Sequence, residues 1–384
     1  QMDKIGLIST NLAEKIAMTV TESPYRVTAE TISNTCGQSI SSGGVWNMMQ
    51  RLGERLDEEE QYAVKEMHAD RTQGEKIIPV LFEEMDGIWL HMQDSSHKRM
   101  KKQEMKVFTM YEGWDKDQQR QSTLVGKTML AGMEPSQLFH EKREALIEKK
   151  YDVDEIQQRI LNGDGGSWIK ETYDPDAIFQ LDRYHVYQEI LRKINDRSAQ
   201  REARNLFEEG KTEELLEFLL VYADSVETTD EKDNRSRNAR ELYRYLNNNK
   251  AGLLPYQKQG KKIPEPGEGI VYKNMGVQES QNCTVITMRM KHRRMRWSIK
   301  GASNMAKVLC CKENKELCRT IEKYTDGLIF NARMNEIMET LSAAKTSKKD
   351  GKGNRYVELM RGHVPLIDAA ATASRKAFRN AFIR

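Results

Sequence analysis

The sequence predicts a mixed fold of the α+β or α/β class, in which a central sheet lies between helical segments. Three observations lead to this prediction. An apolar run at residues 76–93, KIIPVLFEEMDGIWLHMQ, is typical of a strand buried in a sheet. Further strand-like runs follow it after short polar connections. The segments before and after this region have helical apolar spacing instead, and 384 residues suffice for one large domain or two to three ordinary ones.

Composition narrows the class of protein. Charged residues make up 31% of the chain and hydrophobic residues 38%, and no run approaches the roughly 18 apolar residues of a membrane span. We therefore expect no membrane partner. Five cysteines without a C-x-x-C pair predict reduced thiols in a cytoplasmic protein. Because the chain begins at Gln1 rather than Met, we expect the natural protein to have residues before it.

Residues 1–72 are predicted to be helical. A short amphipathic helix from Thr28, a turn at residues 36–37 and a second helix from about Ser41 give the outline of a helix-turn-helix. Arg51 and Arg55 on the second helix would then contact DNA. Plain helical packing explains the same pattern, so both interpretations stay open at this point.

Residues 73–195 are predicted to form the first part of the sheet domain. Three antiparallel strands are followed by a helix, a fourth strand, another helical stretch and a fifth strand. This β-β-β-α-β-α-β order is that of a ribonuclease-H-like domain. The five predicted strands cover residues 76–93, 102–114, 120–132, 158–170 and 177–187, and the first helix covers about 135–151.

This strand order predicts how two aspartates lie relative to each other. The first and fourth strands are neighbours in such a sheet, so Asp86 and Asp164 are expected side by side although 78 residues (164 − 86) separate them. A buried carboxylate such as Asp86 needs a cation or several hydrogen bonds, which makes it either a paired structural acid or a metal ligand. Asp164, between Gly163 and Gly165, fits a ligand site at a strand end or ordinary turn chemistry.

The remainder of the chain divides by composition. Residues 196–262 are predicted to be a helical insertion that interrupts the sheet domain. Residues 263–312 are predicted to complete the core, and they contain Glu279. Residues 313–384 are expected to be helical and basic, with Arg375, Lys376, Arg379 and Arg384 near the end.

A strongly basic segment follows Glu279. No Asp or Glu occurs in residues 280–312, and clustered cations gain free energy from counterion release when they meet a polyanion. This segment predicts a nucleic-acid surface, with a merely solvated basic face as the alternative. Trp297 could stack on a base, but its surroundings have helical apolar spacing and favour the core. The predicted DNA contacts here are Arg289, Lys291, Arg293, Arg294, Arg296 and Lys300.

Five segments in this order resemble DDE transposases of bacterial insertion sequences, specifically the ISLre type. They are FEEMDG, NGDGGSWIK, LDRYH, GVQES and MRWSIKGASNMAKVL, and the likeness covers about residues 25–312. The resemblance implies a retroviral-integrase-like core with an all-helical insertion before the catalytic glutamate. It places Asp86, Asp164 and Glu279 on the three catalytic, metal-binding acids, with Asp182, His185 and Trp297 in supporting positions. Gln278 and Ser280 beside Glu279 depart from the small residues that are usual in the family.

The same resemblance implies metal-dependent cleavage at transposon ends followed by strand transfer into target DNA. Two Mg²⁺ ions, with Mn²⁺ as the alternative, suit three carboxylates. Asp86 is expected to bridge both ions, with Asp164 and Glu279 each completing one. Terminal inverted repeats and target DNA would be the partners of a homodimer or higher homo-oligomer, located with the nucleoid in the bacterial cytoplasm. A catalytically inactive DNA-binding descendant and a resolvase-like nuclease on the same fold are the alternatives.

Overall fold

The computed structural model describes residues 9–37, 39–117, 123–171, 174–228, 233–292 and 295–325. Almost all of these belong to one compact unit, Thr10–Glu322. Across the described ranges no helix combines the length and the apolar character needed to cross a membrane. All five cysteines are free thiols, as the sequence predicts.

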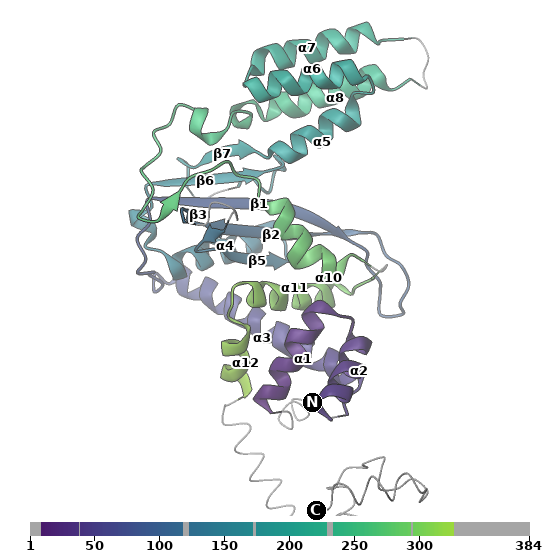
Figure 1. Ribbon diagram of the computed structural model, residues 1–384, viewed down its shortest axis with the longest axis vertical. Helices are drawn as coiled ribbons and strands as arrows, with labels where there is room; N and C mark the ends of the chain where they lie inside the picture. Colours follow the sequence, from purple (N-terminus) through teal and green to yellow (C-terminus); the bar gives the residue numbers. More distant parts are fainter. Residues whose placement is uncertain are drawn as a thin grey trace, which may run out of the picture. The chain divides into compact units, whose positions relative to one another are not determined.

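A five-stranded mixed sheet forms the centre of this unit, in the order β5-β2-β1-β6-β7 (Figure 1). The central strand β1 pairs antiparallel with β2 and parallel with β6, while β5 and β7 form the two edges. The first and fourth long strands are therefore neighbours, which confirms the predicted adjacency. The bounds are Val80–Leu90 for β1, Gln103–Tyr111 for β2, Thr128–Gly132 for β5, Gln158–Gly163 for β6 and Ile178–Leu181 for β7.

Strand β1 is buried on both faces, which explains its long apolar run. On one face Leu81 and Met85 belong to a cluster that includes Phe139 of helix α4, Ser136–Lys150. On the other face Phe82 stacks on Tyr111, with ring centroids 5.4 Å apart. A strand held from both sides is a rigid base for the side chains at its end. The short 3₁₀ turn η2, Val153–Glu155, leads from α4 into β6.

A second, small sheet has the order β4-β3-β8. The predicted third strand is divided, because Gly126 adopts a positive φ of 65 and turns the chain between β4 and β5. Strand β8 brings the chain back after the insertion and pairs with β3. The bounds are Gly113–Asp115 for β3, Leu124–Val125 for β4 and Ile270–Val271 for β8.

The helix predicted between the fourth and fifth strands is wrong for the residues that the structure describes. Residues 167–170 form a turn, and residues 172–173 lie outside the described ranges. Two glycines, Gly165 and Gly166, and Pro175 leave too little uninterrupted chain for a helix. Strand β7 also ends earlier than predicted, since Asp182 caps the following helix.

Three helices precede the sheet: α1, Thr10–Glu22; α2, Tyr25–Cys36; and α3, Ser42–His68. The side chain of Ser41 accepts a hydrogen bond from the Gly44 N–H at 3.0 Å and so caps α3. Helix α3 packs between α4 and α11, Ile299–Glu313. At its contact with α11, a Cβ on Gly53 would lie 2.4 Å from the Cβ of Asn304, so this crossing requires glycine.

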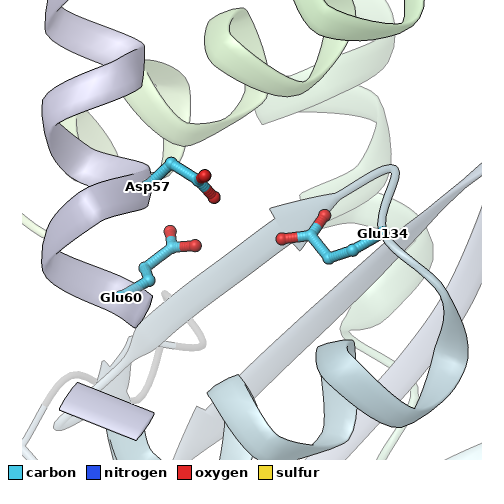
Figure 2. Close-up of side chains that lie close together, drawn as sticks. All are labelled: Asp57, Glu60 and Glu134. Atoms are coloured by element: carbon cyan, nitrogen blue, oxygen red, sulfur yellow. The ribbon is translucent and has the colours of Figure 1, made fainter. Parts of the chain in front are cut away.

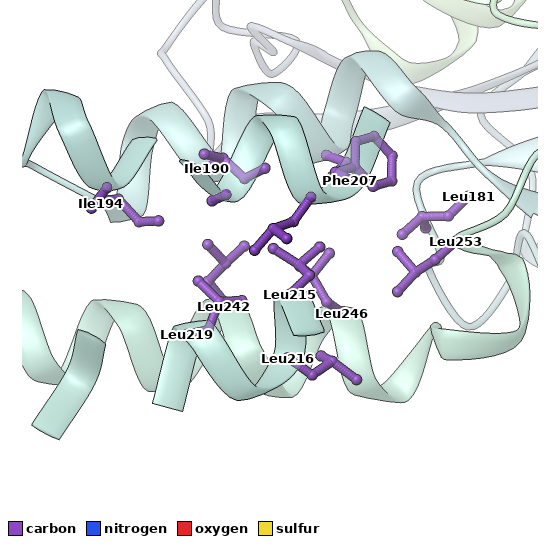
Figure 3. Close-up of a cluster of buried hydrophobic side chains, with 14 residues drawn as sticks. Leu181, Ile190, Ile194, Phe207, Leu215, Leu216, Leu219, Leu242, Leu246 and Leu253 are labelled. Atoms are coloured by element: carbon purple, nitrogen blue, oxygen red, sulfur yellow. The ribbon is translucent and has the colours of Figure 1, made fainter. Parts of the chain in front are cut away.

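Four helices lie between β7 and β8 and have a hydrophobic core of their own (Figure 3). Leucines of α7 and α8 face Ile190 of α5 and Phe207 of α6 across this core. The 3₁₀ turns η3, Lys250–Gly252, and η4, Tyr256–Lys258, lead back toward the sheet. The helices are α5, Arg183–Lys193; α6, Arg197–Glu209; α7, Thr212–Ser225; and α8, Arg235–Asn248.

After β8 the chain is helical again. A π-helical segment, η5 (Asn282–Thr287), joins α9 to α10, and α11 confirms the predicted helix after Trp297. Residues 326–384 lie outside the described ranges, and with them most of the predicted basic C-terminal region, including Arg375, Lys376, Arg379 and Arg384. The remaining bounds are Gln278–Gln281 for α9, Met288–Met290 for α10 and Leu317–Thr325 for α12.

Candidate active site

The register of two parallel strands places Asp86 beside Asp164. Strands β1 and β6 pair until Met85 lies opposite Gly163, and each aspartate is the next residue along its strand. The hydrogen bonds of the ladder fix this register, and a slip of one residue would turn every side chain to the opposite face. The two aspartates therefore lie side by side, Asp86 within β1 and Asp164 just beyond the end of β6.

Asp86 is buried without a lysine or arginine partner among the described residues. Its carboxylate accepts hydrogen bonds from the Gly87 N–H at 2.7 Å and from the Asn282 side-chain amide at 2.6 Å. The nearest cationic group is the Nε2 of His185, 3.8 Å away. Burial raises the pKa of Asp86 to about 6, His185 opposes the rise, and the nearby charges of Asp164 and Glu279 add to it.

Glu83, only three residues earlier, shows what a structurally paired acid looks like in this strand. Its two carboxylate oxygens accept hydrogen bonds from the Arg159 guanidinium at 2.7 and 2.9 Å. Asp86 has no such guanidinium partner among the described residues, and its nearest cationic group is the imidazole of His185 at 3.8 Å. The contrast favours the metal-ligand interpretation of Asp86 over the structural one.

Asp164 lies in the turn that follows β6. Its Oδ1 accepts a hydrogen bond from the Gly166 N–H at 2.8 Å, an arrangement typical of aspartate in turns. Its backbone carbonyl accepts a hydrogen bond from the Tyr245 hydroxyl at 2.9 Å, which ties the helical insertion to this turn. Gly165 has a φ of 84, and a Cβ there would lie 2.4 Å from the amide oxygen of Asn249.

Glu279 is on the first turn of α9 and is exposed. Its carboxylate has no hydrogen-bond or ion-pair partner within the described part of the chain. Its charge raises the pKa of Asp86, as does that of Asp164, so all three acids share one electrostatic neighbourhood. Their oxygens are not gathered within 4.8 Å of one another, the spacing that a single ion would require.

Glu84 connects the segment before Glu279 to the central strand, a role that the sequence did not reveal. It is fully buried, and its carboxylate accepts five hydrogen bonds. Three come from consecutive backbone N–H groups that lead into α9, at 3.1 to 3.2 Å. The other two come from the Tyr111 hydroxyl at 2.6 Å and the Asn162 amide at 3.2 Å. The three backbone donors belong to Gly276, Val277 and Gln278.

This arrangement holds Glu279 near Asp86. Burial raises the pKa of Glu84, while the hydroxyl and the backbone donors favour its charged form. Glu84 and Asp86 lie on the same side of β1 because side chains alternate along a strand. The motif FEEMDG thus contains three different acids: one paired with arginine, one that positions α9, and one with no lysine or arginine partner among the described residues.

Asp182 and His185 form a pair beside Asp86. Asp182 caps α5, and its Oδ2 lies 2.7 Å from the Nδ1 of His185. Burial opposes the protonation of His185, but the hydrogen bond to Asp182 and the charge of Asp86 raise the pKa of His185 to about 9. At neutral pH the imidazole is therefore protonated and places a positive charge beside the acids.

Two of the predicted DNA-contacting or supporting side chains are inside the protein. Arg289 is 4% exposed, and its guanidinium donates a hydrogen bond to the Val20 carbonyl at 2.6 Å. Its guanidinium also lies over the rings of Tyr25 and Trp297. Trp297 is 7% exposed and donates a hydrogen bond to the Met290 carbonyl at 2.8 Å. Contrary to the prediction for Arg289, both side chains join α1 and α2 to the segment after α10 and do not face solvent.

The other predicted DNA contacts differ in their surroundings. Lys291 and Arg296 are exposed. Lys300 pairs with Glu54 at 2.7 Å, and Arg55 pairs with Glu58 at 2.7 Å. Arg51 is half-buried on α3, and Arg293 and Arg294 lie outside the described residues.

A second acidic cluster consists of Asp57, Glu60 and Glu134, whose carboxylates converge from α3 and from the loop after β5 (Figure 2). Two buried ammonium groups already neutralise it. Lys142 lies 2.5 to 2.9 Å from all three acids, and Lys307 lies 2.5 to 3.2 Å from them. Because the lysines occupy the positions where a metal ion would bind, this cluster is a structural charge network that joins α3, α4 and α11 to the sheet.

The residues at Asp86 fit divalent cations better. A hard cation prefers carboxylate oxygens, and here three carboxylates share a neighbourhood in which no described lysine or arginine is bound to them. Two ions about 3.5–4 Å apart would spread their ligands more widely than one ion does. A pair of ions would therefore not require the three carboxylates to lie as close together as a single ion does.

Comparisons with known proteins identify a family for this chain but do not indicate an activity. The sequence pattern of an uncharacterised protein family, UPF0236, matches residues 1–325. A UPF0236 protein of Caldanaerobacter subterraneus subsp. tengcongensis is 23% identical over 354 residues, which cover 88% of this chain and 67% of that protein. A second UPF0236 protein of this organism is 24% identical over 215 residues, which cover 54% of this chain and 43% of that protein.

Proposed function

This chain belongs to the uncharacterised family UPF0236, and from that premise we propose that it is a DDE-type DNA transposase, a metal-dependent enzyme that cleaves transposon ends and joins them to target DNA. The observation that supports the proposal is that Asp164 and Glu279 both lie close enough to Asp86 for their charges to raise its pKa. These three acids come from a central strand, its parallel neighbour and a helix that follows a long insertion. Acids that are distant in the sequence but close in the fold are typical of residues that bind a shared ligand.

The sheet supports the same proposal. Its order β5-β2-β1-β6-β7, antiparallel on one side of β1 and parallel on the other, is the order of a ribonuclease-H-like domain. In that fold the catalytic acids project from the first and fourth strands. Fold alone does not assign function, so the proposal depends mainly on Asp86, Asp164 and Glu279.

The copy number of a relative adds independent support. The printed name of the first relative joins eleven locus designations in a single bacterium. An element that copies itself within a genome produces such repetition, whereas ordinary metabolic enzymes seldom do.

Each residue of the site then has a part in phosphodiester transfer. Asp86, Asp164 and Glu279 would hold the divalent cations, and Glu84 fixes the helix that carries Glu279. Bound Mg²⁺ supplies charge stabilisation at the attacking and leaving oxygens. His185, itself held by Asp182, lies 3.8 Å from one oxygen of the Asp86 carboxylate, and Asn282 donates a hydrogen bond to the other oxygen. In this scheme water is the first attacking group, and the 3′-hydroxyl it exposes is the second.

The decisive experiment incubates the protein with labelled DNA that flanks its own gene, in Mg²⁺, in Mn²⁺ and in excess chelator. We expect nicks that leave 3′-hydroxyl ends at the element boundary, followed by joined products, and neither in the chelator. Mapping the cut strands on sequencing gels measures both steps. DNA binding without any cleavage would support an inactive DNA-binding protein instead, and cleavage of branched DNA without joining would support a resolvase-like nuclease.

Replacing Glu84 with Gln tests how Glu279 is positioned. One carboxylate oxygen becomes an amide nitrogen that faces existing donors, so α9 loses part of its attachment to β1. We expect cleavage to fall by about 10- to 100-fold, or roughly 1.4–3 kcal/mol, and half-maximal cleavage to require more Mg²⁺. The exposed Glu75→Gln serves as the control and should cleave like the unsubstituted protein. Unchanged Mg²⁺ dependence in the Glu84 variant would contradict this positioning role.

A further inference from the structure

The connection between β1 and β2 is strongly basic. Its sequence from residue 97 is HKRMKK, and the four cations Lys98, Arg99, Lys101 and Lys102 are all exposed. The Asp94 carboxylate does not neutralise them, because it accepts hydrogen bonds from the backbone N–H groups of Ser96 and Lys98 at 2.9 and 2.8 Å. Figure 1 shows this hairpin extending from the end of β1 and β2 beyond the other strands of the sheet.

A second basic segment lies against this hairpin, although about 200 residues separate them in the sequence. Met92 and Trp297 form a parallel bridge, with hydrogen bonds from the Gln93 N–H to the Trp297 carbonyl and from the Trp297 N–H to the His91 carbonyl. Lys291 and Arg296 therefore lie near Arg99 and Lys102. Burial and the charges of these four residues lower the pKa of His91, which lies at the bridge between the two segments.

The cations of these two segments are exposed and clustered. Lys98, Arg99, Lys101, Lys102, Lys291 and Arg296 make no ion pair with any residue in the described part of the chain. Some cations elsewhere are paired, for example Lys300 with Glu54 at 2.7 Å and Arg240 with Asp224 at 2.6 Å. An unpaired cluster creates a net positive field that attracts a polyanion.

We propose that these six residues, the basic ribbon, bind the phosphate backbone of duplex DNA beside the bond that is cleaved. The proposal rests on the proposed function for the identity of the polyanion. Asp86 and His91 are on the same extended chain, five residues or about 17 Å apart. At about 3.4 Å per base pair, the ribbon would contact phosphates roughly five base pairs or more from the acids. It would thus hold the flank of the substrate and set its direction across the site.

The test measures binding without cleavage. A fluorescent duplex of about three helical turns is titrated with protein in chelator, and anisotropy gives the affinity at salt concentrations from about 50 to 200 mM. The first variant replaces the four hairpin cations, Lys98, Arg99, Lys101 and Lys102, with Gln. The second replaces Lys291 and Arg296 with Gln, and far-UV circular dichroism melting checks that both fold.

Each lost phosphate contact should reduce the slope of log affinity against log salt by about 0.9. We therefore expect the hairpin variant to lose up to about 3.6 of this slope and at least about tenfold in affinity, and the double variant up to about 1.8 of slope. The control removes four exposed but ion-paired cations of the insertion, with the same change of net charge, and should bind nearly as the unsubstituted protein does. These are Lys211, Arg235, Arg240 and Lys250.

An equal loss in the control would show that net charge alone matters and would overturn the proposal. So would unchanged DNA affinity in both ribbon variants, including the case in which the ribbon binds anionic lipid vesicles instead. Failure of the ribbon is distinguishable from failure of the enzyme. If cleavage at the element boundary persists while DNA binding does not depend on the ribbon, only the ribbon proposal is rejected. If DNA binding depends on the ribbon but no Mg²⁺-dependent cleavage occurs, only the transposase proposal is rejected.

Discussion

Replacing Asp86 with Asn should abolish metal-dependent cleavage while DNA affinity stays unchanged. The substitution keeps the shape of the side chain and removes a buried carboxylate that has no lysine or arginine partner among the described residues. Losing several kcal/mol of charge stabilisation in the transition state corresponds to about a thousand-fold in rate or more. Gel assays of strand cleavage and anisotropy of labelled DNA measure the two properties separately.

The same variant should fold at least as stably as the unsubstituted protein in chelator. Because the folded-state pKa of Asp86 is raised to about 6, its ionised form is disfavoured by folding at neutral pH. Asn carries no charge and avoids this cost, so the melting temperature at pH 7 should not fall. The exposed Asp117→Asn is the matched control and should retain full cleavage. Cleavage by the Asp86 variant at the normal rate would reject the assignment of the metal site.

Replacing Lys307 with Met should destabilise the protein strongly without touching the candidate active site. Lys307 is buried and bound to Asp57, Glu60 and Glu134, so its removal leaves three carboxylates with one ammonium group. Breaking a buried network in this way costs about 3–5 kcal/mol. Urea denaturation followed by circular dichroism measures the loss.

Lys300 offers a matched control for this substitution. It lies on the same helix α11 and pairs with Glu54 of the same helix α3, but it is 70% exposed. Lys300→Met should therefore cost no more than about 1 kcal/mol. Equal effects of the two substitutions would mean that the buried network contributes no more than a surface ion pair.

Acidification should narrow the difference between the Lys307 variant and the unsubstituted protein. Burial alone would raise the pKa of Glu134, but Lys307 and Lys142 hold it below its ordinary value. An acid with a lowered folded-state pKa stabilises the fold above its unfolded-state pKa, and this contribution is lost as the pH falls toward the folded-state value. Below about pH 4.5 the unsubstituted protein should therefore lose more stability than the variant.

The sequence predicted the strands well because their apolar runs are long and their order is informative. Asp86 and Asp164 follow from that order, since parallel pairing of β1 and β6 is enough to bring them together. The different roles of the three acids in FEEMDG could not be predicted from the sequence. Glu83, Glu84 and Asp86 look alike in sequence, and their roles depend on Arg159 and on the backbone before α9, which are distant in the chain.

The basic surface was only half predicted for a related reason. The segment after Glu279 stands out because it has no acids, and the sequence alone treats all its cations as equal. Folding buries Arg289 against Val20 and leaves Lys291 and Arg296 exposed. Folding also places the hairpin between β1 and β2 beside this segment, through a bridge between Met92 and Trp297. No local sequence pattern predicts this bridge.

The position of the helical insertion also determines when the protein becomes complete as it is synthesised. The five strands of the large sheet are finished at Leu181, but Glu279 emerges 98 residues (279 − 181) later. The insertion has its own core and mostly local contacts, so it can fold rapidly while the rest of the chain is still emerging. A nascent chain that has been synthesised only as far as the insertion carries two of the three acids. We expect such a chain to lack the proposed DNA-cleavage activity.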